Sequence, residues 1–398
     1  MLQAAQFLQL TVVAMLGLAL VMVRSADMAV GAKAPPFDPM RFLFSRQTAY
    51  ATLAIGAMLL ASRLPWRRVV TWRPRFNPFN WAILVAIALL LAQWIPFLGH
   101  EVNGALRWIQ IEVGGRKFTF QPSELAKWAM VLWIPWWVAT QTRRIDRLFS
   151  RGFLVPLVVL LGVVGVIIGE DLGTAVLIFS VGVGLLLAAG ARFWHLALLI
   201  PPGVMGVAAV IMSSDYRRAR LTAFLDPWAD PEGIGYHPIQ SMLAIAQGGP
   251  TGRGVGNGVQ KFGYLPEDTT DFLFSIICEE MGIVGAVLVV SFYLVVLVVG
   301  FGILRRCPDA FGRLVALGIL LMLGAQALMN LAVVTVVVPT KGIALPLLSS
   351  GGTGWVMTAA AIGVLASLDE TDPALREDDG VLSGEPLPSE GLAIEGGT

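Results

Sequence analysis

The sequence predicts an all-α integral membrane protein with about ten transmembrane helices. Of its 398 residues, 56% are hydrophobic and only 14% are charged, and the mean hydropathy is +0.73. A soluble domain of this length needs far more polar surface. The first apolar run, Ala4–Val23, follows no basic segment of the kind that begins a removable signal peptide, so we expect it to be retained as a helix.

The expected spans follow from the roughly 20 apolar residues that a helix needs to cross a bilayer. They centre on Ala4–Val23, Gln47–Ala61, Phe79–Leu98, Ser123–Gln141, Phe153–Ile168, Gly173–Gly190, His195–Met212, Phe272–Leu304, Leu314–Val338 and Trp355–Leu368. Pro156, Pro201 and Pro202 are expected to kink or start helices rather than to prevent them.

Arginines in the short loops predict the orientation of the chain. They gather between spans two and three, four and five, six and seven, and eight and nine, which places these loops and both termini in the cytoplasm. The arginines concerned are Arg63, Arg67, Arg68, Arg73, Arg75, Arg143, Arg144, Arg147, Arg151, Arg192, Arg305, Arg306 and Arg313.

The connection from about Ser213 to Thr270 is then a large extracellular loop between helices 7 and 8. Loops of this length are usually functional or disordered, and the aromatic residues in this one argue against disorder. Residues 1–368 are predicted to form one polytopic membrane domain. Residues 369–398 are acidic, rich in Gly and Pro and poor in aromatic residues, which predicts a disordered cytoplasmic tail.

Two cysteines, Cys278 and Cys307, predict neither a disulfide framework nor a metal site. The histidines are scattered along the chain and suggest no catalytic triad. The formal net charge is only +1, and no nucleic-acid partner is expected.

The polar residues of most interest lie in three outer segments. The first runs from Asn103 to Ile109 and continues at Gln121–Lys127. Glu124 and Lys127 are three residues apart on one helical face and can pair, either structurally or while contacting a substrate. Arg107, beside Trp108, lies on the side of the membrane that is usually poor in arginine, which favours anion binding over simple interfacial anchoring.

The second segment is a glycine-rich loop that leads to Asp271 at the start of a long apolar run. Asp271 could cap that helix or could act as a general base. The loop glycines allow tight turns whose backbone N–H groups can cradle phosphate, although no P-loop ending is present. Arg253 and Lys261 could bind a phosphate or merely solvate the loop. Glu279 and Glu280 follow Asp271 by about two turns and are best interpreted as pairing elsewhere.

The third segment, Pro339–Thr353, contains Lys341 as a lone cation among small and apolar residues. Lys341 could snorkel to the membrane interface or could contact a substrate. Ser349, in the same segment, is a further candidate for substrate binding.

Together these segments resemble the SEDS family (shape, elongation, division and sporulation proteins) from Met1 to Leu368. The FLDPWADP run, the GNGVQK run and Pro339–Gly342 are more similar to its division branch (FtsW) than to its elongation branch (RodA). The other motifs are Asn103–Ile109, Gln121–Lys127, Asp171–Thr174, Gln240-Ser241, Leu265–Glu267, Thr270–Phe272, Glu279-Glu280, Asn330 and Leu345-Pro346. The sequence departs from the family pattern at Glu170, His237, Thr269 and Ser350.

The resemblance implies a peptidoglycan glycosyltransferase that polymerises lipid II into β-1,4 glycan strands. It implies that Asp271 is the general base and that Arg107, Lys127 and Lys341 are candidates to hold the leaving diphosphate. A divalent cation, Mg²⁺ or Mn²⁺, could share that role, although no motif requires one. The expected partners are a class B penicillin-binding protein, which is a transpeptidase, and other division or elongation membrane proteins.

Two other functions remain open at this point: a lipid II flippase and a non-catalytic scaffold for division proteins. A flippase needs polar groups in both halves of the bilayer. The polar motifs of this chain crowd the outer side, which favours chemistry there.

Overall fold

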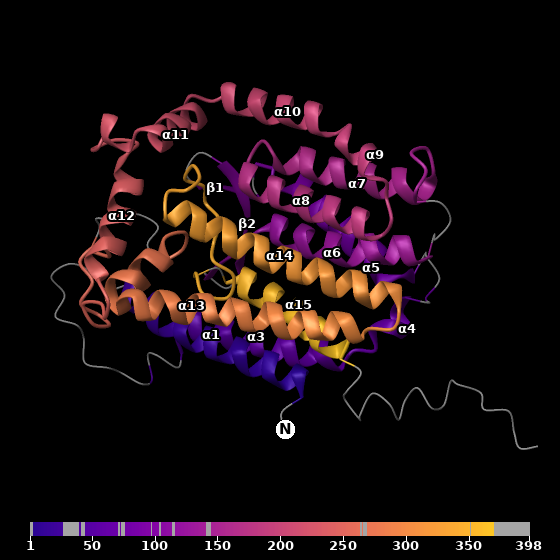
Figure 1. Cartoon of the computed structure of the whole chain (residues 1–398), viewed down its shortest axis with the longest axis horizontal. Coiled ribbons are helices and arrows are strands. Elements are labelled where there is room, and N and C mark those ends of the chain that lie inside the picture. The colour runs from indigo at the N-terminus through magenta and orange to yellow at the C-terminus, as the bar shows by residue number, and fades with distance from the viewer. Residues whose placement is uncertain are drawn as a thin grey trace, which may run out of the picture.

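The computed structural model is a bundle of roughly parallel helices with a small sheet and, along one side of the bundle, a helical arch (Figure 1). It describes residues 3–26, 40, 44–70, 72, 76–96, 98–102, 105–113, 116–140, 145–262, 265, 269–350 and 352–369.

Each of the ten predicted spans overlaps a helix. The helices are α1 (Ala4–Ala26), α3 (Arg46–Arg63), α4 (Trp66–Val70), α5 (Pro78–Ala92), α6 (Pro122–Thr140), α7 (Arg151–Ile167), α8 (Leu172–Ala188), α9 (Phe193–Ala197), α10 (Ile200–Met212), α11 (Asp215–Leu225), α12 (Tyr236–Gly248), α13 (Leu273–Arg306), α14 (Ala310–Val334) and α15 (Thr353–Ser367). Within the described residues, four segments are long and apolar enough to cross a membrane: Ala4–Ala26, Phe193–Met212, Leu273–Arg306 and Ala310–Val334. The number of crossings therefore stays a prediction, while the helical membrane class is confirmed.

Local sequence explains where several helices begin. Ser45, Ser150, Asp171 and Asp309 precede α3, α7, α8 and α14, and each side chain accepts a hydrogen bond from a backbone N–H in the first turn. Such caps satisfy N–H groups that have no partner inside the helix. The prolines at 201 and 202 occupy the first turn of α10, where no helical hydrogen bond is lost.

Helix α6 lies at the centre of the bundle and packs against α5, α7, α8, α14 and α15. Its tryptophans Trp128, Trp133 and Trp136 are buried. Helices α3 and α15 come especially close, because a β-carbon on Gly363 would lie only 2.2 Å from the carbonyl oxygen of Met58. This close approach lies in the C-terminal halves of both helices.

The prediction of an all-α fold is wrong for the segment between α5 and α6. Strands β1 (Gly99–Val102), β2 (Ala105–Val113) and β3 (Arg116–Phe120) form an antiparallel sheet in the order β1-β2-β3. Ile109 pairs with Gly99 on one side and with Phe120 on the other. The alternating polar and apolar residues of the segment explain the strands, since this period suits a sheet with one covered face.

The large loop expected from residue 213 to 270 contains two helices, α11 and α12, and a short 3₁₀ turn, η2 (Pro227–Ala229). With α10 they form the arch in Figure 1, and none of the α10 residues is buried. The residues at 263–264 and 266–268, which carry part of one sequence motif, lie outside the described residues.

The C-terminal end of the bundle extends one residue beyond the predicted boundary. Asp369, assigned to the tail by its sequence, is fully buried and accepts hydrogen bonds from Arg306 Nη2 (3.1 Å) and the backbone N–H of Ala5 (3.2 Å). The tail predicted from residue 370 onward lies outside the described residues. Cys278 and Cys307 are both buried and do not form a disulfide with each other.

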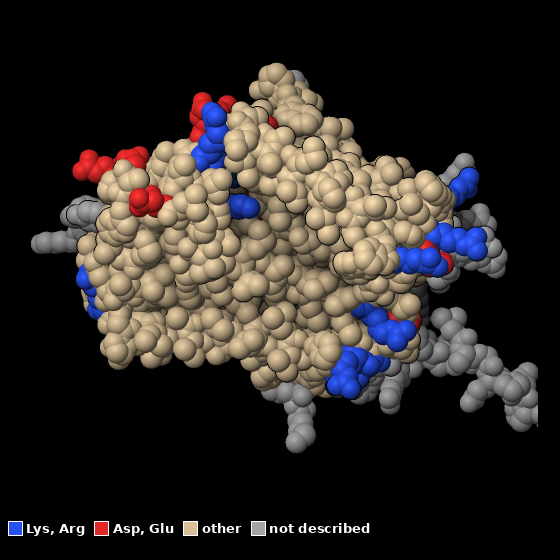
Figure 2. Space-filling model, turned by 45° about the horizontal axis from the view of Figure 1, so that its top comes forward, with Lys and Arg blue, Asp and Glu red and all other residues tan. Residues whose placement is uncertain are grey.

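The face shown in Figure 2 has a broad uncharged region, with most charged side chains toward its two ends. This distribution fits a protein whose middle faces hydrocarbon.

Candidate functional site

A cavity of about 190 Å³ opens where the sheet, the bundle and the Pro339–Thr353 segment meet. It brings together six of the nine residues predicted from the sequence: Arg107, Trp108, Glu124, Lys127, Asp271 and Ser349. The other lining residues include Gln121, Thr174, Gln326, Gly342 and Trp355. These residues come from β2, α6, α8, α14, α15 and the loops beside them.

Asp271 immediately precedes the cap residue of α13 and is half-buried. The cap position of α13 belongs to Phe272 rather than to Asp271. The backbone carbonyl of Asp271 accepts a hydrogen bond of 2.8 Å from Asn330 Nδ2, which also donates to the carbonyl of Ile343 (2.7 Å). Asn330 thereby fixes Asp271 beside the loop that carries Gly342.

Arg107 approaches the same place from the sheet. A β-carbon built on Gly342 would lie 2.9 Å from Asp271 Oδ2 and 3.5 Å from Arg107 Nη1. The carboxylate and the guanidinium therefore converge on one point beside Gly342. Arg107 Nε donates to the carbonyl of Glu170 (2.9 Å), while Glu170 Oε2 accepts from the backbone N–H of Leu106 (2.8 Å). Glu170, a departure from the family pattern, thus docks β2 on the turn before α8.

Glu124 and Lys127 form the pair that their spacing predicts. Lys127 Nζ lies 2.8 Å from Glu124 Oε1 and donates to Gln326 Oε1 at 2.7 Å. Gln326 Nε2 in turn donates to the carbonyl of Ala344 (2.9 Å). Lys127 is only 1% exposed, and a buried charge of this kind needs both the ion pair and the amide. The pair anchors the cavity wall and contributes a cation to it.

Lys341 and Ser349 have different surroundings. Lys341 is half-buried beside Gly342; burial lowers the pKa of its ammonium from the ordinary value of 10.5, and the charge of Asp171 partly opposes this change. Ser349 is buried; its hydroxyl accepts from the backbone N–H of Leu345 (2.9 Å). Its carbonyl accepts from Trp355 Nε1 (2.6 Å). Ser349 therefore shapes the loop as well as lining the cavity.

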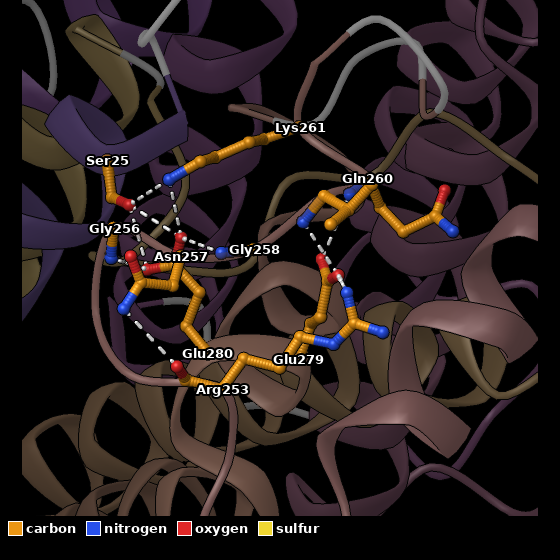
Figure 3. A network of polar contacts seen from close by, with 10 residues as sticks. Ser25, Arg253, Gly256, Asn257, Gly258, Gln260, Lys261, Glu279 and Glu280 are labelled. Atoms are coloured by element: carbon orange, nitrogen blue, oxygen red, sulfur yellow. Dashed lines mark hydrogen bonds and ion pairs between the residues drawn. The ribbon is translucent and has the colours of Figure 1, made fainter. Parts of the chain in front are cut away.

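The structure places Lys261 outside the cavity, in a separate buried network (Figure 3). Its side chain is 0% exposed, and Nζ contacts Glu280 Oε1 at 2.8 Å and Ser25 Oγ at 2.9 Å. Glu280 also accepts from Ser25 Oγ and from the backbone N–H groups of Gly256 (2.9 Å) and Gly258 (3.3 Å). Lys261 neutralises an internal carboxylate rather than facing an open site.

Arg253 also lies in this network (Figure 3). Its Nη1 is 3.6 Å from Glu279 Oε1, and Glu279 accepts from the backbone N–H groups of Val259 (2.8 Å) and Gln260 (3.1 Å). The glycine-rich loop does cradle anions with its amides, as its composition suggested. The anions are the carboxylates of Glu279 and Glu280 themselves.

The same loop supplies hydrogen-bond partners to the backbone at a break in α13. Gly282 has φ 62° and ψ −152°, which interrupts the helix. The backbone N–H groups of Arg253 and Gly254 donate to the carbonyls of Glu279 (3.0 Å) and Glu280 (2.9 Å). On the other side of the break, the N–H of Ile283 donates to the carbonyl of Gly249 (3.0 Å). The short helical segment from 273 to 281, which follows Asp271, is thereby tied to the loop on both its side chains and its backbone.

Comparison with known proteins identifies the family. Residues 6–373 match the family model of FtsW, RodA and SpoVE, described as cell cycle proteins. The chain belongs to this family.

Curated relatives agree with this membership. A probable peptidoglycan glycosyltransferase FtsW of Geobacter metallireducens is 36% identical over 90% of this chain and 92% of its own. Another, from Thioalkalivibrio sulfidiphilus, is 39% identical over 90% of this chain and 87% of its own.

Two solved structures are similar as well. A chain from a peptidoglycan synthase complex that coordinates polymerization and crosslinking aligns with TM-score 0.70 and 27% identity, covering 92% of this chain and 97% of its own. Rod shape determining protein RodA of Thermus thermophilus aligns with TM-score 0.60 and 27% identity over the same shares.

Several cavity residues of this family member were not predicted as site residues, notably Gln326 and Thr174. Gln326 is a polar residue inside the apolar run Leu314–Val338, and such residues in membrane helices often mark functional sites. This signal was present in the sequence. Within the described ranges, no cluster of three or more His, Cys, Asp or Glu side chains could hold a metal ion.

Replacing Lys261 by Met should lower the free energy of unfolding by about 3–5 kcal/mol, because Glu280 would remain buried without its cation. Unfolding of the purified protein in detergent micelles measures this change. The double variant Lys261→Met with Glu280→Gln should recover part of the loss.

Arg253→Gln is the matched control, since Arg253 is 37% exposed and should contribute much less. A Lys261→Met protein of normal stability that binds lipid II poorly would contradict the structural role and favour a substrate contact.

Proposed function

We propose that this chain is a peptidoglycan glycosyltransferase that polymerises lipid II into β-1,4 glycan strands at the outer face of the cytoplasmic membrane, for cell division. The observation that carries the proposal is the convergence of Asp271 and Arg107 on Gly342 in a polar cavity of a membrane bundle. A base and a cation at one point suit an attack by a hydroxyl with departure of a diphosphate.

In the proposed reaction, the 4-hydroxyl oxygen of the acceptor GlcNAc attacks the anomeric carbon of the donor MurNAc with inversion. The new carbon–oxygen bond forms as the bond from that carbon to the diphosphate oxygen breaks. Asp271 takes the hydroxyl proton, and undecaprenyl diphosphate leaves with the bonding electron pair. General base catalysis of this kind contributes about 10²–10⁴-fold to the rate.

The leaving diphosphate needs positive charge close to the anomeric carbon. Arg107 reaches the same point as Asp271, and its Nε bond to Glu170 holds its guanidinium in place. Lys127 lines the cavity but is paired with Glu124, and Lys341 is next to the lining residue Gly342 in the chain without lining the cavity itself. Arg107 is therefore the principal cation for the leaving group, with Lys127 and Lys341 raising the local potential. Mg²⁺ or Mn²⁺ bound to the diphosphate would add charge, and Glu124 and Asp271 are the carboxylates that could reach it.

The positions of the arginines indicate on which side of the membrane the cavity opens. The described arginines Arg305 and Arg306 lie at the end of α13, opposite the end that begins beside Asp271. With ten membrane crossings and the arginine-rich end in the cytoplasm, the cavity opens on the outer side, where lipid-linked sugars are joined.

The partner is a class B penicillin-binding protein that cross-links the strands made here. The similar chain from a peptidoglycan synthase complex supports this proposal, because polymerization and crosslinking are coordinated in that complex. Other membrane proteins of division or elongation complete the assembly.

Asp271→Asn should reduce lipid II polymerisation by about 10²–10⁴-fold or more, because the side chain keeps its shape and loses its basicity. The measurement is strand formation by the purified protein with lipid II, with and without the candidate transpeptidase. Asp215→Asn, at an exposed position of α11, is the matched control. Near-normal strand formation by Asp271→Asn would remove Asp271 as the base.

The lowered pKa of Lys341 predicts a pH dependence. A lysine with a lowered pKa loses its charge at a pH below 10.5, so the turnover that depends on this cation should fall as pH rises through that lowered pKa. Lys341→Arg should remove this alkaline fall, since arginine stays charged. The pH profile of kcat/KM for both proteins tests this, and identical profiles would show that the charge of Lys341 does not assist turnover.

A further inference from the structure

A second cavity, of about 170 Å³, adjoins the Asp271 cavity. The two share Trp108, Ser350 and Trp355 as a common wall. The second cavity is otherwise lined by the first turn of α3, by β3 and by the start of α15, through Arg46, Gln47, Tyr50, Thr119, Gly352 and Thr353. Its described lining residues are rich in hydroxyl groups and include a guanidinium but no carboxylate.

Arg46 is held at the rim of this second cavity. Its Nη2 donates to Thr119 Oγ1 at 3.3 Å, and its guanidinium lies 5.5 Å from the centre of the Tyr50 ring. No ion pair with Arg46 forms within the described part of the chain. The five N–H donors of Arg46 suit a phosphate or a carboxylate. The hydrogen bond to Thr119 orients the guanidinium, and because a hydroxyl is neutral it leaves the positive charge uncompensated.

Two features of α15 also favour an anion. The hydroxyl of Thr353 is buried and has no hydrogen-bond partner among the described residues. The cap residue of α15 is Gly352, which has φ 39° and gives the first helical N–H groups no side-chain acceptor. Gly352 lies against Tyr50, so that a β-carbon there would be 3.1 Å from the ring. Thr353 and Gly352, at this uncapped helix start, line the same cavity as Arg46, and a helix N-terminus and an unpartnered hydroxyl both favour an anion nearby.

The chemistry of polymerisation requires a second anion site. The leaving diphosphate is bonded to the reacting anomeric carbon, so it must lie in the Asp271 cavity. The acceptor keeps its own diphosphate, which is separated from the attacking 4-hydroxyl by two sugar rings. That group therefore needs a place outside the first cavity but continuous with it. A separate cavity, lined by Leu60, Trp66 and Met357 among others, does not suit a diphosphate, because its described lining residues are all apolar.

We propose that the second cavity binds the diphosphate of the acceptor substrate, with Arg46 as its main ligand and Thr353 as a supporting donor. Trp108 and Trp355, which belong to both cavities, lie along the acceptor disaccharide between the two sites. This inference rests on the proposed polymerase function and assigns its second substrate subsite.

The test uses two lipid II analogues that react only once with each other. The donor lacks the GlcNAc 4-hydroxyl and cannot accept, and the acceptor has a methylene in place of its anomeric oxygen and cannot donate. The apparent KM of each is measured while the other is held constant. Arg46→Gln should raise the KM of the acceptor about tenfold and leave that of the donor within about twofold. Thr353→Val should raise the KM of the acceptor about threefold.

Arg63→Gln is the matched control, because Arg63 is the exposed last residue of the same helix. Arg46→Lys, which keeps the charge, should recover part of the lost affinity. The inference is overturned if Arg46→Gln changes neither KM, or raises both equally.

The phosphate group of an ordinary membrane lipid has similar chemistry, so the assay is run in nanodiscs of phosphatidylcholine with and without phosphatidylglycerol. The acceptor effect should be the same in both. An effect that appears only with phosphatidylglycerol would overturn the acceptor assignment. If the wild-type protein does not join the two analogues at all, the proposed function fails, independently of Arg46.

Discussion

The break in α13 at Gly282 is the constraint on which the placement of the candidate site depends. Backbone N–H and C=O groups near a membrane find no water to replace a lost helical hydrogen bond, so an interrupted helix needs partners from the protein. The glycine-rich loop supplies them through Arg253, Gly254 and Gly249. A β-carbon at Gly252 would lie 2.1 Å from the carbonyl oxygen of Glu280, so the loop can come this close only as glycine.

The carboxylates beside the break make this arrangement specific. Glu279 and Glu280 are buried, and burying such charges is costly unless they are paired and hydrogen-bonded. Four loop amides, Lys261 and Ser25 satisfy them. The segment that follows Asp271 is consequently fixed to α1 at one end, while Asn330 fixes Asp271 itself at the other. A base held in this way needs little reorganisation when a substrate binds.

The helices and most of the candidate site residues could be predicted from the sequence. Apolar length predicted segments that each overlap a helix, and the spacing of Glu124 and Lys127 predicted their pair. Arg253 and Lys261 were placed in the wrong environment, because cations in a glycine-rich loop look alike whether the anion is a substrate or a distant side chain of the same protein. Only the fold brings residues 279 and 280 back to the loop. The sheet was missed because the elements were sought by apolar length, and a strand such as β2, which alternates polar and apolar residues, is not an apolar run.

The most direct measurement is a cryo-EM structure of the Asp271→Asn protein with lipid II bound. The account predicts a GlcNAc 4-hydroxyl within hydrogen-bond reach of residue 271, about 2.6–3.2 Å, and a diphosphate against Arg107. A lipid II molecule bound elsewhere on the protein, with the Asp271 cavity free of sugar and diphosphate, would contradict it.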